Sequence, residues 1–195
     1  RAIQGHGIPE AMEQILTNSS RIPPRSTFLK PVSSAIAIGT GGPFGAEGPI
    51  IATGGALGSF LGQLLHTTGV ARKTLLAAGA AAGMTAIFGS PLAAVVLAVE
   101  LLLFELRAQT LIPVSVACAV AACARERLFE AGPVFPMHAI PIIGARGLLF
   151  YSVLGLLVGV AAVGVTRLVY AIEDGFEKLP IHWMWWPALG AVAVG

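Results

Sequence analysis

Apolar stretches that are interrupted by glycine and proline before they reach the length of a membrane span constrain the fold of this chain most. One pair of such stretches covers residues 31–40 and 48–65, and a second pair covers residues 74–88 and 92–106. A simple spanning helix needs about 20 apolar residues without strong breakers. The pattern therefore predicts two pairs of helices, each broken within the membrane.

Composition supports a membrane environment. The chain is 55% hydrophobic and 11% charged, with a mean hydropathy of +0.81, whereas about a quarter of the residues in an average soluble chain are charged. A soluble domain of this size could not bury so much apolar surface in one core. The formal net charge of +2 is small and scattered, so nucleic acid is not an expected partner.

Two cleaner apolar segments follow the broken pairs, at residues 111–124 and 144–170, with a proline-rich loop at residues 132–141 between them. The second segment is long enough to cross a bilayer at a tilt. Because no start Met or signal precedes Arg1 and the last apolar run is cut, we expect residues 1–195 to be part of a longer, multi-pass integral membrane protein of the plasma or inner membrane.

Broken helices at membrane depth indicate a transport site. Backbone groups that lose their hydrogen bonds in lipid cost several kcal/mol each, so such breaks persist around a cavity that holds water or a ligand. The alternative is that glycine serves close helix packing. We prefer the packing interpretation for Gly54, Gly58 and Gly62, and the transport interpretation for the glycine-rich break that precedes them.

The break at residues 41–50 has the chemistry of an anion site. Pro49 suits the first turn of a helix, so we expect a helix to begin at Gly48, with its free N–H groups and positive dipole end directed into the break. Glu47 lies at the same place and could occupy the anion position when ionised and leave it when protonated. A nucleotide-binding loop is excluded, because Pro49 and Ile50 stand where that motif requires Lys and Ser or Thr.

The string GHGIPE at residues 5–10 similarly places small residues before a proline and an acid at an expected helix start. With GAEGPI at residues 45–50 and FGSPLA at residues 88–93, it resembles the ordered signature of the CLC chloride channel and transporter family, over nearly the whole chain.

The resemblance implies an all-α membrane protein, a CLC-type bundle of tilted and broken re-entrant helices. The full subunit would contain two inverted repeats, form a homodimer and have one pore per subunit. This chain would be a partial transmembrane domain, containing much of the first repeat and the helix that follows. The resemblance assigns Glu47 as the gate and chloride as the bound substrate ion. The residues it assigns to anion binding are His6, Gly7, Ile8, Gly45, Ala46, Glu47, Gly48 and Ile50.

Three departures from the family pattern bear on function. His6 stands where the family usually has an anion-contacting serine; an imidazole N–H could donate likewise, or the ring could turn away. Ala46 replaces the usual basic residue beside the gate. Leu101 occupies the position from which a glutamate relays protons in the family's exchangers, and Leu carries no proton. We therefore expect a channel or a weakly coupled transporter, with a proton-coupled antiporter, a fluoride-type branch and a structural scaffold without transport as alternatives.

Charge placement predicts the topology. If each broken pair returns to the side from which it entered, six basic residues share one side, which should be cytoplasmic: Arg21, Arg25, Lys30, Arg72, Lys73 and Arg107. For Glu100 and Glu105 we favour a structural role, in which they pair with Arg107 or water.

The remaining polar and aromatic residues indicate no catalytic or metal chemistry. Ser90 lacks the flanking glycines of a nucleophile elbow and has no base in reach, so an enzyme is not expected. His66, His138 and His182 share no ligand spacing with a Cys or an acid, and we expect no metal and no cofactor. Cys118 and Cys123 should lie on different faces of one helix as reduced packing residues. The tryptophans fit an interfacial belt: Trp183, Trp185 and Trp186.

Overall fold

The computed structural model describes residues 7–42, 45–129, 132, 134, 136 and 144–194. The chain divides into two compact units, Arg1–Pro136 and Met137–Gly195, which are considered separately. Every regular element among the described residues is a helix, as the all-α prediction requires.

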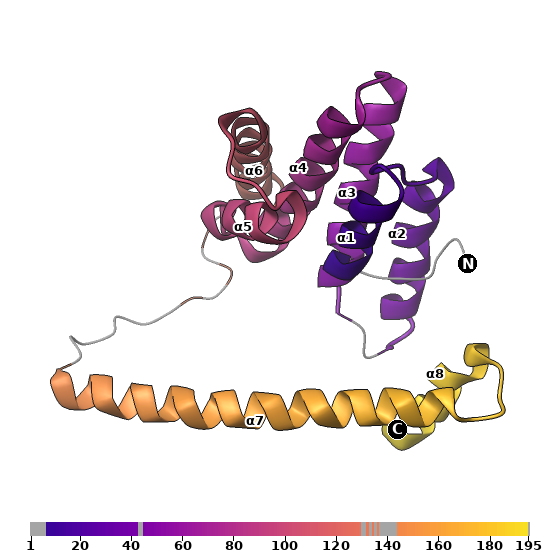
Figure 1. The fold of residues 1–195 in the computed structure, drawn as a ribbon, viewed down its shortest axis with the longest axis vertical. Coiled ribbons are helices and arrows are strands. Elements are labelled where there is room, and N and C mark those ends of the chain that lie inside the picture. Colours follow the sequence, from indigo (N-terminus) through magenta and orange to yellow (C-terminus); the bar gives the residue numbers. More distant parts are fainter. Residues whose placement is uncertain are drawn as a thin grey trace. The chain divides into compact units, whose positions relative to one another are not determined.

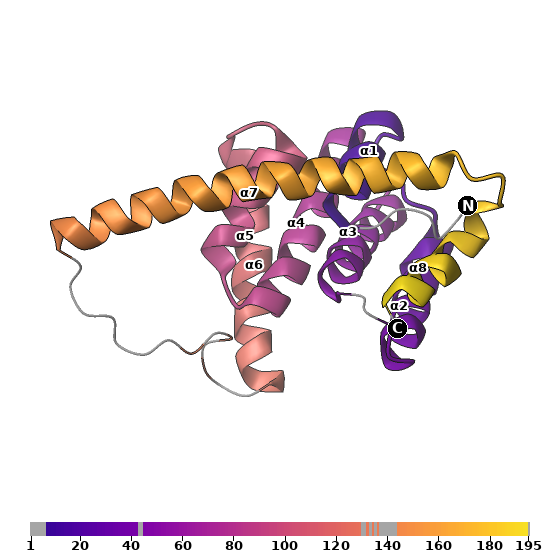
Figure 2. The same cartoon turned by 90° about the horizontal axis from the view of Figure 1, so that it is seen from below.

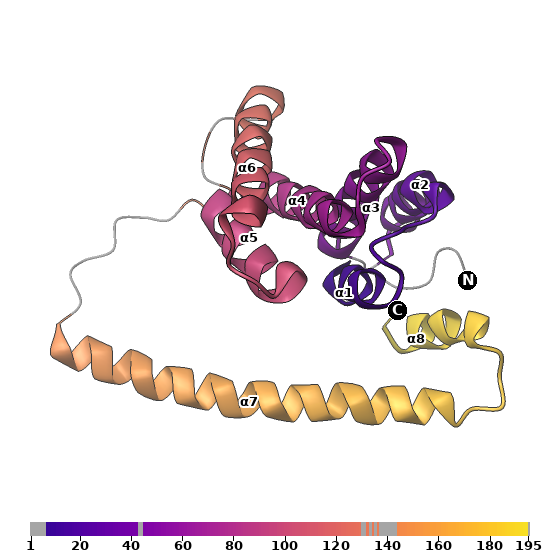
Figure 3. The same ribbon diagram turned by 45° about the horizontal axis from the view of Figure 1, so that its top comes forward.

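The first unit is a bundle in which α4 lies between α3 and α6 (Figure 1 and Figure 3). Its elements are α1 (Gly7–Thr17), α2 (Pro24–Gly39), α3 (Glu47–Leu64), α4 (Gly69–Phe88), α5 (Pro91–Ala98), the π-helical turn Val99–Leu103 and α6 (Ala108–Leu128). The helices α1 and α2 both pack on α3, and α1 also contacts α4 and the π-helical turn, so α3 and α1 together join the two halves of the bundle.

Glycine makes the contact between α3 and α4 possible. A Cβ atom built on Gly54 would lie 2.2 Å from the carbonyl oxygen of Gly79, and one on Gly58 would lie 2.0 Å from that of Leu75. Only residues without a side chain allow backbones to approach this closely. At the end of α3, a Cβ on Gly62 would lie 2.8 Å from Cγ of Arg72. The packing interpretation of these glycines is therefore confirmed.

The first broken pair returns to the side from which it enters. Near the start of α2, the N–H of Ile22 donates to Oγ of Ser59 at 3.0 Å, and the Ser59 hydroxyl donates to the carbonyl of Ser20 at 2.6 Å. Gln63, at the end of α3, donates to the carbonyl of Ile22 at 2.9 Å. The segment before α2 and the last turns of α3 are thus joined, as the topology prediction requires.

The second broken pair also returns. The predicted break forms at Gly89, which has a left-handed φ of 63° and donates to the carbonyl of Thr85 before Pro91 opens α5. At the far end, the Lys73 ammonium donates to the carbonyl of Leu103 at 2.6 Å. The start of α4 and the end of the π-helical turn therefore lie side by side. The helical stretch ends at Leu103 and not at residue 106, because Phe104 turns the chain with a φ of 57°.

Two predicted segments were shorter than the observed helices, because each of these helices contains a proline in its interior. The helix predicted from residue 31 begins at Pro24, so Pro31 lies inside α2, and α6 contains Pro113 and extends from Ala108 to Leu128. Each interior proline removes one backbone hydrogen bond without ending its helix. On α6, Cys118 is buried and Cys123 exposed, which confirms that the two cysteines face different ways.

The second unit contains the long helix α7 (Ala145–Glu177), a 3₁₀ turn (Trp183–Trp185) and α8 (Trp186–Val194) (Figure 2). The rings of Phe176 and Trp186 lie 6.0 Å apart and connect the end of α7 to the start of α8. By length and composition, α6 and α7 could each cross a membrane, with mean hydropathies of 1.4 and 2.4. With 33 residues, α7 is about 50 Å long at 1.5 Å per residue, enough to cross at a tilt.

Candidate functional site

The beginnings of α1 and α3 meet. Gly7 is buried, has a φ of 69°, and would place a Cβ atom 3.3 Å from Cα of Gly48. The left-handed backbone favours glycine at position 7, and the short distance to Gly48 leaves little room for a side chain. The two motifs, which lie about 40 residues apart in the sequence, are thereby joined through their glycines. Ile8, the next residue of α1, is partly buried against the core.

The first turn of α3 leaves backbone donors open. The helix begins at Glu47, one residue before the predicted start, with Ala46 as its N-cap and no side-chain hydrogen bond to the cap. Pro49 is therefore the third helical residue and has no N–H. The Ile50 N–H, which was assigned to anion binding, donates instead to the carbonyl of Ala46 at 3.1 Å and thus has a partner within the helix. The amides of Glu47 and Gly48 precede this first bond and belong to the unpaired group at a helix start.

The residues around this helix start have open space beside them. Gly45, Ala46 and Glu47 are exposed, and a Cβ atom on Gly45 would meet no atom of the described residues within 4 Å. The positive end of the helix dipole favours a negative charge there.

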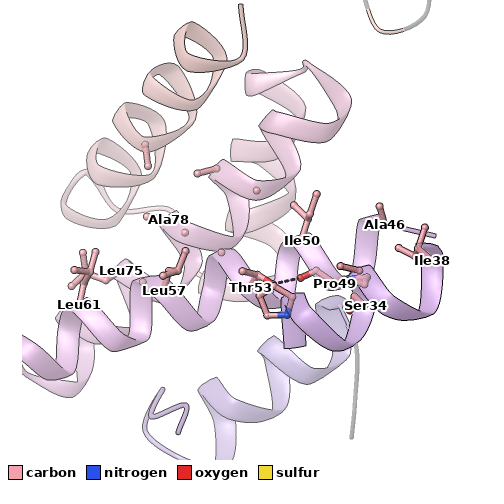
Figure 4. A pocket seen from close by; sticks show the side chains of 18 residues that line it. Ser34, Ile38, Ala46, Pro49, Ile50, Thr53, Leu57, Leu61, Leu75 and Ala78 are labelled. Carbon is pink, nitrogen blue, oxygen red and sulfur yellow. Dashed lines mark hydrogen bonds between the residues drawn. The ribbon is translucent and has the colours of Figure 1, made fainter. Parts of the chain in front are cut away.

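An apolar cavity of about 710 Å³ begins beside the same helix start (Figure 4). Ala46, Pro49 and Ile50 line one part of it together with Ser34 and Ile38 of α2, and the cavity continues along α3 and α4. The Thr53 hydroxyl, which could have faced the cavity as a donor, instead donates to the carbonyl of Pro49 at 2.7 Å. The cavity wall is consequently mostly apolar, and besides the Ser34 hydroxyl the donors for water or an anion lie at the helix start.

One charged pair near the site was missed at the sequence level. Lys30 of α2 forms an ion pair with Glu10 in the first turn of α1, and the exposed fractions of the two side chains are 6% and 12%. Lys30 was interpreted as a boundary charge that sets topology. The signal that could have revealed its role was its position directly before the apolar stretch at residues 31–40, because a buried Lys needs a carboxylate partner.

The predicted proton-relay position lies in irregular helix. Leu101 is partly buried in the π-helical turn Val99–Leu103, beside the exposed Glu100. Arg107 pairs with Glu105, Nε to Oε2, at 3.3 Å, which confirms the structural interpretation for Glu105. Single-turn π-helices recur at functional sites, but the side chain at position 101 has no titratable group.

Some predicted residues fall outside the described part of the chain. His6, Pro43, Phe44 and His138 are among them. Of the predicted anion-binding residues, the structure thus places Gly7 and Ile8 at one helix start and Gly45, Ala46, Glu47, Gly48 and Ile50 at the other. Over the described residues, no group of three or more His, Cys, Asp or Glu side chains could hold a metal ion.

The described residues form an all-helical bundle with broken helix pairs and two helix starts that meet. The chain belongs to the voltage gated chloride channel family, whose family description matches residues 1–195.

Curated relatives agree with this assignment. The chain is 28% identical to a ClcB-like chloride channel protein of Ralstonia nicotianae, over 97% of this chain and 45% of the relative. It is 27% identical to the chloride channel protein CLC-f of Arabidopsis thaliana, over 97% of this chain and 26% of that protein. It is 34% identical to the H(+)/Cl(−) exchange transporter ClcA of Vibrio cholerae, over 73% of this chain and 31% of that protein. The chain thus spans less than half the length of these relatives, and no solved structure matches it with statistical significance.

Proposed function

We propose that the protein moves chloride or a similar small anion across a membrane, and that Glu47 gates this movement. The observation that carries the proposal is the close approach of Gly7 to Gly48, which directs two helix starts toward one break. Backbone N–H groups and the positive ends of helix dipoles together bind anions without a formal positive charge. The relatives named as chloride channels and as an H(+)/Cl(−) exchange transporter support the same substrate.

Gating would follow from competition between the Glu47 carboxylate and the anion for the same binding position. The Glu47 carboxylate and a transported anion would both seek the free amides at the start of α3, and only one negative charge can be held there. Protonation removes the charge of Glu47 and releases the amides to the anion. The exposed position of Glu47 and the empty space around Gly45 leave room for this movement.

The transport mode is proposed to be channel-like or weakly coupled to protons. Leu101 stands at the position where a proton relay would be needed, and an aliphatic side chain transfers no proton. A proton-coupled antiporter is the second candidate, because the Vibrio cholerae relative is named as an exchanger. The active unit is proposed to be a homodimer in the lipid bilayer.

Anion flux from proteoliposomes that contain the complete protein tests the proposal. Chloride, bromide or nitrate should leave the vesicles faster than from protein-free controls, and fluoride should be measured in parallel. If none of these anions moves faster than the control, transport is refuted and the structural scaffold becomes the better account.

A further inference from the structure

We propose that a second anion site, for a phosphate group, lies at the end of the first unit where the α1–α2 and α3–α4 connections meet. Two cavities of about 320 and 820 Å³ open there, and Arg21, Thr67 and Arg72 line both of them. These volumes fall in the range of ligand pockets. Glu47 begins α3 and this site lies at its other end, 18 residues later, so about 27 Å of helix separates the two.

Arg72 is the buried element of the site. Only 6% of its surface is exposed, and its guanidinium donates to the carbonyl of Ser19 at 3.3 Å and to that of Thr67 at 2.9 Å. Its Nε–H, one of the donors that these two bonds do not use, is buried and has no partner among the described residues. An arginine has no deprotonated form to adopt in a protein, so this side chain brings an uncompensated positive charge to the wall of both cavities.

Three further donors surround the same openings. Arg21 is exposed, and its guanidinium makes no ion pair or hydrogen bond within the described part of the chain. His66 lines the smaller cavity, and Gly69, the first residue of α4, lines the larger one. The Ala71 N–H donates to the Thr68 hydroxyl at 3.3 Å, so the start of α4 contributes the N–H groups of Gly69 and Val70 and a positive dipole end.

The charge balance favours a multivalent oxyanion. The described residues that line the two cavities include two arginines and a histidine but no carboxylate. Donors that approach from the α1–α2 connection, from the α3–α4 connection and from a helix start match the several oxygens of a phosphate group. A bound phosphate group would therefore neutralise the positive charge of these side chains, which the described lining residues leave unbalanced.

The phosphate group could belong to a lipid headgroup or to a free phosphate, and two measurements on the complete protein distinguish these sources. Equilibrium dialysis in neutral detergent measures binding of inorganic phosphate, and native mass spectrometry after delipidation counts bound phosphatidylglycerol against phosphatidylcholine. We expect saturable binding in one of the two measurements. Loss of one charged hydrogen-bonding group should weaken it about tenfold in Arg21→Gln.

Arg25→Gln is the matched control, because Arg25 is an exposed arginine at the start of α2 that lines neither cavity. It should bind like the parent, and unchanged thermal unfolding of both variants shows that each is folded. Arg72→Lys is a second variant that keeps the charge but loses the planar donors; if folded, it should also bind more weakly. Absent binding in both measurements, or equal losses in Arg21→Gln and Arg25→Gln, would overturn the proposal.

Discussion

The start and the middle of the stretch from residue 45 to residue 62 use glycine in opposite ways. Gly54 and Gly58 press against the backbone of α4, where an added Cβ atom would lie within 2.2 Å of a carbonyl oxygen. A Cβ atom added to Gly45 would meet no atom of the described residues within 4 Å. Glycine in the middle of α3 therefore serves packing, whereas glycine before α3 leaves space at an exposed helix start. A local glycine count cannot separate the two uses, and only the partner helix does so.

The largest effect is expected in the packed half. In Gly58→Val, the new side chain would collide with the backbone at Leu75, and neither helix backbone can yield as a flexible side chain would. We expect a loss of about 3 kcal/mol or more in the free energy of unfolding, measured as a large fall in the melting temperature of the detergent-solubilised protein.

Gly45→Ala is the matched control for Gly58→Val, because its Cβ atom would enter open space. Its melting temperature should stay near that of the parent. Equal destabilisation by the two variants would contradict the division of α3 into a packed half and an open start.

Gly7 contacts the start of α3 at Gly48, and its replacement should have an intermediate effect on stability. Gly7→Ala would place a side chain on a residue with a φ of 69°, 3.3 Å from Gly48, at a cost of about 1–2 kcal/mol. We expect a modest fall in melting temperature together with a clear loss of anion flux in proteoliposomes, because the two helix starts must separate. A fall in melting temperature with unchanged flux would show that their convergence does not serve transport.

The sequence predicted the two broken pairs because glycine and proline act locally, as they do at Gly89 and Pro91. It also predicted that cysteines five residues apart would face different ways, which follows from helical periodicity. It missed the Lys30–Glu10 pair, since the contact joins two helices whose packing no local pattern encodes. It placed the start of α3 at Gly48, one residue after the observed start at Glu47, and the Ile50 amide, which the family resemblance assigned to the anion, donates to the carbonyl of Ala46.

Glu47 should affect transport without affecting stability, since its side chain is exposed and its neighbour Gly45 has open space. In the parent, acid pH should increase anion flux because protonation empties the place that the carboxylate occupies. Glu47→Gln imitates the protonated acid, so its flux should be high at neutral pH and should rise no further as the pH falls. Proteoliposome efflux measured across this pH range checks both expectations.

Glu13→Gln provides the matched control for Glu47→Gln, because Glu13 is an exposed acid on α1 that lies outside the break. Its flux should keep the pH response of the parent. A Glu47→Gln protein that kept that response as well would exclude Glu47 as the gate and direct the search for the titrating group to His6.

The smallest effect is expected at the π-helical turn, where Leu101 occupies the predicted proton-relay position. A chloride gradient imposed on vesicles containing the complete protein should drive almost no proton uptake, because Leu101 offers no relay between the interior and the gate. A pH-sensitive dye inside the vesicles measures this, with protein-free vesicles as the baseline. Stoichiometric proton uptake would refute the prediction and would place the relay elsewhere. The adjacent Glu100, which is exposed, would then be the first residue to replace, and Glu100→Gln should abolish the uptake while Glu105→Gln, whose carboxylate pairs with Arg107, should leave it intact.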